Sequence, residues 1–207
     1  MRVNYQKNWI EELYVYAIEV LQNGGFDIGN ATISKNDIIM EAEIANLTKE
    51  VDFFVNESHQ EDFITEINLN ANDIFVVGKW GLFLLNTIGK EDVAFIEHTF
   101  PDDKVFYSQE ARRSEAFYNA RLYFMVNNMI ILNGIPTNQF RIPMSRAERL
   151  ERNVDEMRMI DQKIILIGST NGRFRLVLPR DVQFGATHTR IRLRLSGLLV
   201  QNALRMP

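Results

Sequence analysis

The chain has 207 residues, of which 46% are hydrophobic and 24% charged; it contains no cysteine and carries a formal net charge of −4. These values are typical of a globular protein and exclude a disulfide framework, a thiol nucleophile and a cysteine-based zinc site. The length predicts a single domain over residues 1–207, and asparagines at the ends of many short apolar runs predict that it is β-rich. No apolar run reaches the roughly 18 residues that a membrane-spanning helix needs, so we expect a protein without a membrane span that is made in a cytoplasm.

The charge is distributed unevenly along the chain. Residues 1–104 contain 7 basic and 19 acidic residues, whereas residues 105–207 contain 16 basic and 8 acidic residues, and 15 of those 16 are arginine. Arginine is suited to bidentate contacts with carboxylates and phosphates. Such a chain could pair its acidic surface with the basic surface of a neighbour, or present its arginines to a polyanion.

An N-terminal helical arm is predicted over residues 1–24. Asn8 and Glu11 form a capping-box pattern, and Asn23 precedes two glycines that end the helix. The helix carries apolar residues on more than one side, so it either packs beneath a sheet of its own chain or docks on a neighbouring subunit. The residues of a possible inter-subunit contact are Trp9, Ile10, Leu13, Tyr16 and Val20.

Between Ala31 and Phe100 the apolar residues alternate with a period of two, which predicts short strands. The expected strands are Ile38–Ile44, Val51–Val55, Phe63–Leu69, Ile74–Val77, Leu82–Leu85 and Val93–Ile96. Many short strands separated by turn residues favour a sandwich or barrel. Trp80 and the other aromatics of this half could stack on nucleic-acid bases, but core packing is the preferred interpretation.

The second half adds three features. A brief helix is expected over Ser108–Tyr118, and a hairpin over Arg121–Leu132 turns at Asn127 and Asn128, with a continuous helix as the rival interpretation. A capping box at Ser145 and Glu148 predicts an amphipathic helix inserted over residues 145–160. Strands Lys163–Ile167 and Arg173–Leu178 then flank Gly168–Gly172, where an Asn-Gly hairpin turn is preferred over a phosphate-binding loop because no helix follows.

The segment Thr189–Leu195 alternates three arginines with three aliphatic residues. A period of two puts Arg190, Arg192 and Arg194 on one face of a strand and the aliphatic residues on the other. The arginine face could be solvated, could meet acidic residues of a second subunit, with Glu41 and Glu43 as the expected partners, or could bind nucleic acid. Arg173 and Arg175 are assigned to the same interaction site, for assembly or for a polyanion.

Patterns for other chemistry are weak. Glu57, His59, Glu61 and Asp62 lack the spacing of known metal motifs, so a solvated acidic loop is the better interpretation and no metal or other cofactor is predicted. His98 and His188 have no nucleophile motif near them, so no catalytic residue is assigned and the chain is not predicted to be an enzyme.

Short segments across residues 63–203 resemble capsid proteins of tailless icosahedral bacteriophages. They are Asn70–Leu82, Thr99–Pro101 with Val105 and Phe106, Ala116–Leu122, Arg175–Pro179 and Leu195–Ala203. The resemblance implies a jelly-roll shell protein with no catalytic residues. Capsid proteins of this kind frequently have two barrels per chain, for which 207 residues is short.

We therefore expect a mainly β, jelly-roll-like sandwich or barrel with an N-terminal helix and an inserted amphipathic helix. The predicted function is a structural subunit of a bacteriophage virion that self-associates into a shell and contacts other virion proteins, with nucleic acid as a possible partner of the arginine face. The alternatives are a non-enzymatic β-barrel that binds nucleic acid or protein, and an enzyme whose site the sequence does not reveal.

Overall fold

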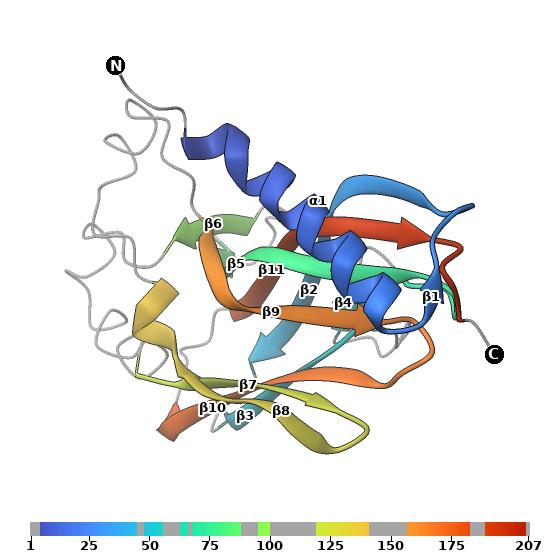
Figure 1. Cartoon of the computed structure of the whole chain (residues 1–207). Coiled ribbons are helices and arrows are strands. Elements are labelled where there is room, and N and C mark those ends of the chain that lie inside the picture. Colours follow the sequence, from blue (N-terminus) through green and yellow to red (C-terminus); the bar gives the residue numbers. More distant parts are fainter. Residues whose placement is uncertain are drawn as a thin grey trace.

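A computed structural model describes residues 5–44, 48–55, 63–65, 68–87, 95–99, 119–140, 157–182 and 189–205. This part of the chain is mainly β (Figure 1). Its elements are α1 (Tyr5–Asn23), β1 (Phe26–Asp27), β2 (Thr32–Ile44), β3 (Thr48–Phe54), β4 (Phe63–Thr65), β5 (Ile74–Thr87), β6 (Phe95–Thr99), β7 (Arg121–Val126), β8 (Met129–Pro136), the 3-10 helix η2 (Thr137–Phe140), β9 (Arg158–Ile167), β10 (Gly172–Val182), β11 (Thr189–Gln201) and β12 (Leu204–Arg205).

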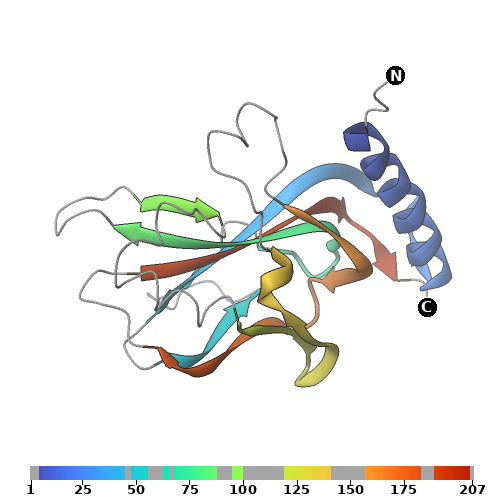
Figure 2. The same ribbon diagram turned by 90° about the vertical axis from the view of Figure 1, so that its left-hand side faces the viewer.

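The long strands form two antiparallel sheets that face each other (Figure 2). One has six strands, in the order β4-β2-β11-β5-β6 with β9 also paired to β5, and the other has four, in the order β3-β10-β7-β8. Their pairings are nested: β7 pairs with β8, β5 with β9, β3 with β10, and β2 with β11. The short strands β1 and β12 form a separate pair.

Alternation along the strands builds the core between the two sheets. Ile191, Leu193 and Leu195 of β11 are fully buried there, as the period of two predicts. Phe124 and Phe174 of the opposite sheet belong to the same core, and their two ring centroids lie 4.7 Å apart. Trp80 of β5 is also buried in this core and packs against Phe140, which confirms the core-packing interpretation of Trp80. The interior is therefore filled by apolar side chains.

Helix α1 lies across the outer face of the six-stranded sheet (Figures 1 and 2). Its buried stripe, Trp9, Leu13, Ala17 and Leu21, packs on apolar residues of β5 and β11. Gly78 permits the approach, because a Cβ there would come within 2.7 Å of both Leu13 and Trp9. Within the described ranges no helix has both the length and the apolarity to cross a bilayer.

Several expectations for the elements are confirmed and others are wrong. Asn127 and Asn128 form a tight turn with φ of 48° and 65°, so the β7–β8 hairpin is confirmed and its helical rival is wrong. The helix begins at Tyr5, before the expected cap at Asn8. The two strands expected around Gly78 are one strand, β5, which absorbs an irregularity at that glycine instead of turning.

The helical insertion expected over residues 145–160 also differs from the structure at its C-terminal end. Residues 145–156 lie outside the described residues, but Arg158–Ile160 belong to β9, where Arg158 and Met159 pair with Trp80 and Lys79 of β5. The ladder supplied by β5 therefore outweighs the helical pattern at that end. The brief helix expected over Ser108–Tyr118 also falls outside the described residues.

The Gly168–Gly172 segment does not join a hairpin, because β9 lies in the larger sheet and β10 in the smaller one. It carries the chain from one layer to the other, and neither Asn171 nor Gly172 has a positive φ. Gly168 donates its amide hydrogen to the Asp73 carbonyl oxygen at 2.9 Å, and a Cβ on Gly168 would lie 1.8 Å from the Asn70 carbonyl oxygen. Close approach of two backbones, rather than a left-handed turn, explains the glycine there.

Candidate functional site

The arginine row of β11 lies on the outer face of the six-stranded sheet, beside the region that α1 covers. Arg190, Arg192 and Arg194 project away from the core, and 24%, 24% and 41% of their side chains are exposed. The separation of charged and aliphatic faces that the sequence predicts is thus confirmed.

Glu41 on the adjacent strand β2 is the main partner of this row. It lies opposite Arg192 in the β2–β11 register, and only 7% of the residue is exposed. Its Oε1 accepts a hydrogen bond of 2.7 Å from Arg192 Nε and contacts Nη2 of the same guanidinium, while Oε2 lies 3.8 Å from Arg190 Nη1. A nearly buried carboxylate is thereby held between two cations.

Arg194 pairs with Asp37, farther along β2. Its Nε donates to Asp37 Oδ2 at 3.1 Å, and its Nη2 donates to the same oxygen. Burial alone would raise the pKa of Asp37, but hydrogen bonds from Ser196 and Arg194, together with the charge of Arg194, outweigh it and hold that pKa below its ordinary value. Asp37 is therefore an ionised partner at neutral pH.

These contacts change the interpretation of the arginine row. Glu41 was expected to meet it from a second subunit, but in the structure it does so from the neighbouring strand of the same chain. Glu43 lies opposite Arg190 in the register, and its side chain is outside the described residues. The like charges along β11 are thus compensated within the sheet. The sequence pattern allows a solvated face, a second subunit or nucleic acid beside the arginines, whereas the structure shows carboxylates of the same chain there.

Arg173 and Arg175 form a second charged row, on the outer face of the four-stranded sheet. Arg175 makes a bidentate contact with Asp52, with Nε and Nη2 each 2.7 Å from a carboxylate oxygen, and its Nη1 lies 3.0 Å from Glu50. The Asp52 hydrogen bond raises the pKa of Arg175, so this arginine stays charged. The five arginines predicted as one site therefore occupy two different sheets.

The residues of the possible inter-subunit helix contact mostly pack within their own chain. Trp9 and Leu13 are buried against the six-stranded sheet, Ile10 and Tyr16 are partly buried beside them, and Val20 is partly buried. Lys79 Nζ lies 4.3 Å from the centroid of the Trp9 ring, a cation–π contact that fixes the helix further. Among the side chains of α1 that the structure describes, the large exposed apolar ones are instead Tyr14 and Val15.

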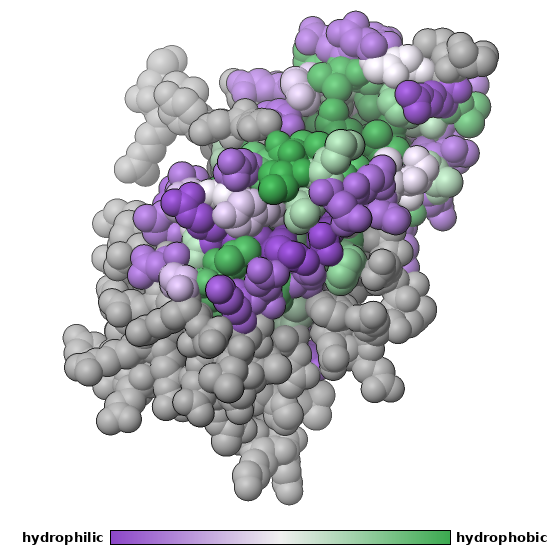
Figure 3. All heavy atoms as spheres, turned by 90° about the horizontal axis from the view of Figure 1, so that it is seen from below, coloured by the Kyte–Doolittle hydropathy of each residue, from purple (hydrophilic) through white to green (hydrophobic). Residues whose placement is uncertain are grey.

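Two surface features escaped the sequence patterns. Exposed apolar side chains gather at Met129, Ile130 and Ile131 of β8 and at Met159 of β9. Ile131 and Met159 line a groove of about 530 Å³ between these strands. Figure 3 views the molecule from the side of the four-stranded sheet, where hydrophobic and hydrophilic residues are interleaved over the described part. Since the strand pattern does not reveal which strands are edges, it could not predict this groove.

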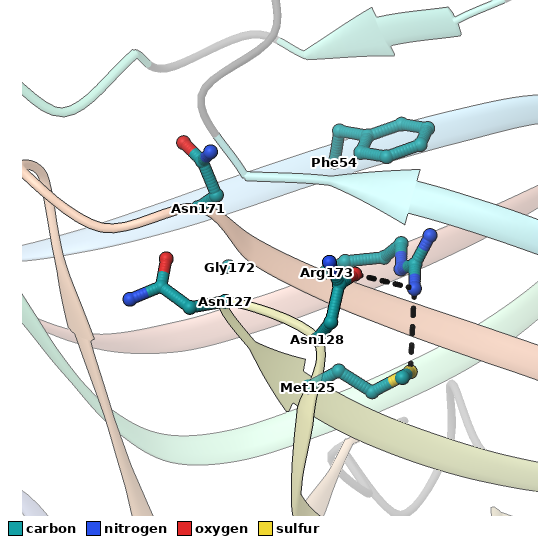
Figure 4. A pocket seen from close by; sticks show the side chains of 7 residues that line it. All are labelled: Phe54, Met125, Asn127, Asn128, Asn171, Gly172 and Arg173. Carbon is teal, nitrogen blue, oxygen red and sulfur yellow. Dashed lines mark hydrogen bonds between the residues drawn. The ribbon is translucent and has the colours of Figure 1, made fainter.

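The second feature is a cavity of about 210 Å³ at one end of the four-stranded sheet (Figure 4). It is lined by Phe54, Met125, Asn127, Asn128, Asn171, Gly172 and Arg173. The sequence marked these asparagines as turn residues only, and their convergence depends on the pairing of β10 with both β3 and β7.

The remaining weak patterns are not tested by the structure. Glu57, His59, Glu61 and Asp62 lie outside the described residues, as do His188 and the side chain of His98. In the part of the chain that is described, no group of three or more histidine or acidic side chains is arranged to hold a metal ion.

Comparison with protein-family models, with curated proteins and with solved structures finds no match for this chain. Functional inference therefore rests on its own fold and surfaces.

Proposed function

We propose that the chain is a structural subunit of a virion, a bacteriophage shell protein that self-associates, and that its sandwich is a jelly roll. The nested strand pairing carries this proposal. Numbered in chain order, the eight strands β2, β3, β5, β7, β8, β9, β10 and β11 pair first with last, second with seventh, third with sixth, and fourth with fifth. Such rolled-up pairing is typical of the jelly rolls that build viral capsids, and it also occurs in lectins and cupins.

The filled interior favours a structural role. Aromatic and aliphatic side chains of both sheets occupy the space between them, so the described part of the core is filled and the outer surface is left for binding. The described arginines of β11 contact carboxylates of β2, which supports a role in holding the sheet together. We therefore propose a non-enzymatic protein whose function depends on its outer surface.

The groove between β8 and β9, which is lined by apolar residues together with Asn133, Gln139 and Arg158, is the surface best suited to a contact between subunits. Met129, Ile130, Ile131 and Met159 each have at least half of their area exposed. Of these four residues, Ile131 and Met159 line the groove. Exposed apolar residues that lie together mark interaction surfaces, and aromatic and methionine side chains are enriched at the centre of interfaces. Trp80 forms part of the wall of this groove. Burial of this edge by a neighbour would join subunits laterally and leave both sheet faces intact.

The test is assembly of the purified chain, followed by light scattering and negative-stain microscopy. We expect closed particles or rings, and we expect Ile131→Lys to reduce them because it puts a charge into the groove. Tyr14→Lys is the matched control: it puts the same charge on another exposed apolar residue, which lies on α1 and outside the groove, so this variant should assemble normally. A parent protein that remains monomeric at every concentration and salt would contradict the shell function. The binding-module alternative would then gain support if filter-binding detected nucleic acid.

A further inference from the structure

We infer that the cavity beside Arg173 binds a carboxylated sugar of monosaccharide size, such as a hexuronic acid. The inference does not depend on the proposed shell function. It rests on the lining of the cavity, which three strand ends and two turns supply, with the Asn127 and Asn171 carboxamides at one side and the Arg173 guanidinium at the other (Figure 4). About 210 Å³ is smaller than the roughly 300–1,000 Å³ of sites for drug-sized ligands, so a single sugar ring is the appropriate scale.

The cavity is held open by the backbone. Asn127 donates its amide hydrogen to the Asn171 carbonyl oxygen at 3.1 Å, and Val55 donates to the Gly172 carbonyl oxygen at 3.0 Å. The β7–β8 turn is also fixed by the positive φ of Asn127 and Asn128. Because these bonds join three separate segments, the lining is positioned before any ligand arrives, which lowers the entropic cost of binding.

Arg173 supplies the cation for a carboxylate. Its contacts are long: Nη1 is 3.5 Å from Asp52 Oδ2, and Nη2 is 3.3 Å from Asn128 Oδ1 and 3.7 Å from the Met125 sulfur. Charge-assisted hydrogen bonds are normally about 2.7–2.9 Å. Asp52 gives its short contacts to Arg175 instead. The guanidinium of Arg173 is thus only weakly compensated, and it retains donors for an anion that enters the cavity.

The other lining groups select hydroxyls. The carboxamides of Asn127 and Asn171 each offer a hydrogen-bond donor and an acceptor, as does a sugar hydroxyl. A neutral, non-aromatic ligand such as a sugar ring can therefore bond to both amides. Phe54 and Met125 provide the apolar wall against which the C–H face of a sugar ring can pack. A simple inorganic anion would use Arg173 but would leave the amides and the apolar wall without a role.

The test is saturation-transfer difference NMR, which works for a monomer and for a large assembly, with sodium glucuronate, glucose and sodium acetate as probes. We expect glucuronate to bind at least tenfold more tightly than glucose, which lacks the carboxylate, and than acetate, which lacks the hydroxyls. Transfer should reach the ring protons of glucuronate. Absence of transfer, equal affinity for glucose, or equal affinity for acetate would overturn the inference.

Two variants locate the site. Arg173→Gln should weaken glucuronate binding at least tenfold, whereas Arg121→Gln, which changes an arginine on the same sheet outside the cavity, should not alter it. Asn127→Gly removes one carboxamide and keeps the turn, since glycine accepts a positive φ, and should weaken binding severalfold. Equal loss in Arg121→Gln and Arg173→Gln would overturn the inference. Particles without glucuronate binding would refute this inference alone, and binding without particles would refute only the shell function.

Discussion

Replacing Arg192 by Gln should destabilise the monomer, because Arg192 is the closest cation to a nearly buried carboxylate. Glu41 is 7% exposed and receives its short hydrogen bond from Arg192, whereas Arg190 is 3.8 Å away. Removing one partner of a buried ion pair costs about 3–5 kcal/mol. Since Arg192 is itself about a quarter exposed and Arg190 remains near Glu41, we expect a loss of about 2–3 kcal/mol.

The assay is urea unfolding of the parent, Arg192→Gln, Glu41→Gln and the double variant. The double variant should regain at least about 1 kcal/mol relative to the sum of the single losses, because it leaves no isolated charge. Arg194→Gln is the matched control: its side chain is 41% exposed and its partner Asp37 is 28% exposed, so about 0.5–1 kcal/mol is expected. Equal losses of unfolding free energy for Arg192→Gln and Arg194→Gln, or additive losses in the Arg192–Glu41 double-mutant cycle, would refute a stabilising ion pair between Arg192 and Glu41.

Three further predictions address other parts of the fold. The pKa of Asp37 is lowered in the folded state, so the stability that its carboxylate contributes is present above the ordinary aspartate pKa of about 3.9 and is lost as the pH falls through the folded value. Asp37→Asn should therefore reduce the acid dependence of the unfolding free energy below about pH 4. Gly168→Ala should lower the melting temperature far more than Asn171→Ala, since only the former brings a Cβ to 1.8 Å from a carbonyl oxygen. Trp9→Ala should cost about 3–5 kcal/mol in urea unfolding and Val15→Ala less than about 0.5 kcal/mol, and similar losses would contradict the packing of α1.

The sequence predicted which face of a strand each side chain occupies better than it predicted which strand or chain lies beside it. A period of two determines that Arg192 and Leu193 point to opposite sides whatever pairs with β11, so that prediction needed no tertiary information. Charge complementarity also identified Glu41 as the partner. It could not identify the chain that supplies Glu41, because a carboxylate 151 residues away in sequence and one on another subunit satisfy the same guanidinium equally well.

Local turn chemistry failed for a related reason. Asn171-Gly172 has the composition of a tight hairpin turn, yet β9 finds its partner in β5 and β10 finds its partners in β3 and β7. Each of these three pairings joins six residue pairs, which outweighs the turn preference of two residues. The candidate cavity was hidden by the same limitation, since Asn127, Asn171 and Arg173 meet only through that long-range pairing.

The pairing of the β11 arginines and of Arg175 within the chain also indicates where an assembly contact should form. Part of the outer face of the six-stranded sheet is covered by α1, and beside it the carboxylates of β2 compensate the arginines of β11. On the four-stranded sheet, Asp52 and Glu50 engage Arg175. A partner binding to either charged row would have to displace these contacts and desolvate charges, which costs more than burying apolar side chains. The groove at Ile131 and Met159 instead presents exposed apolar side chains, so we expect the proposed shell to grow through the sheet edges and its assembly to persist at high salt, where exposed charge pairs are screened.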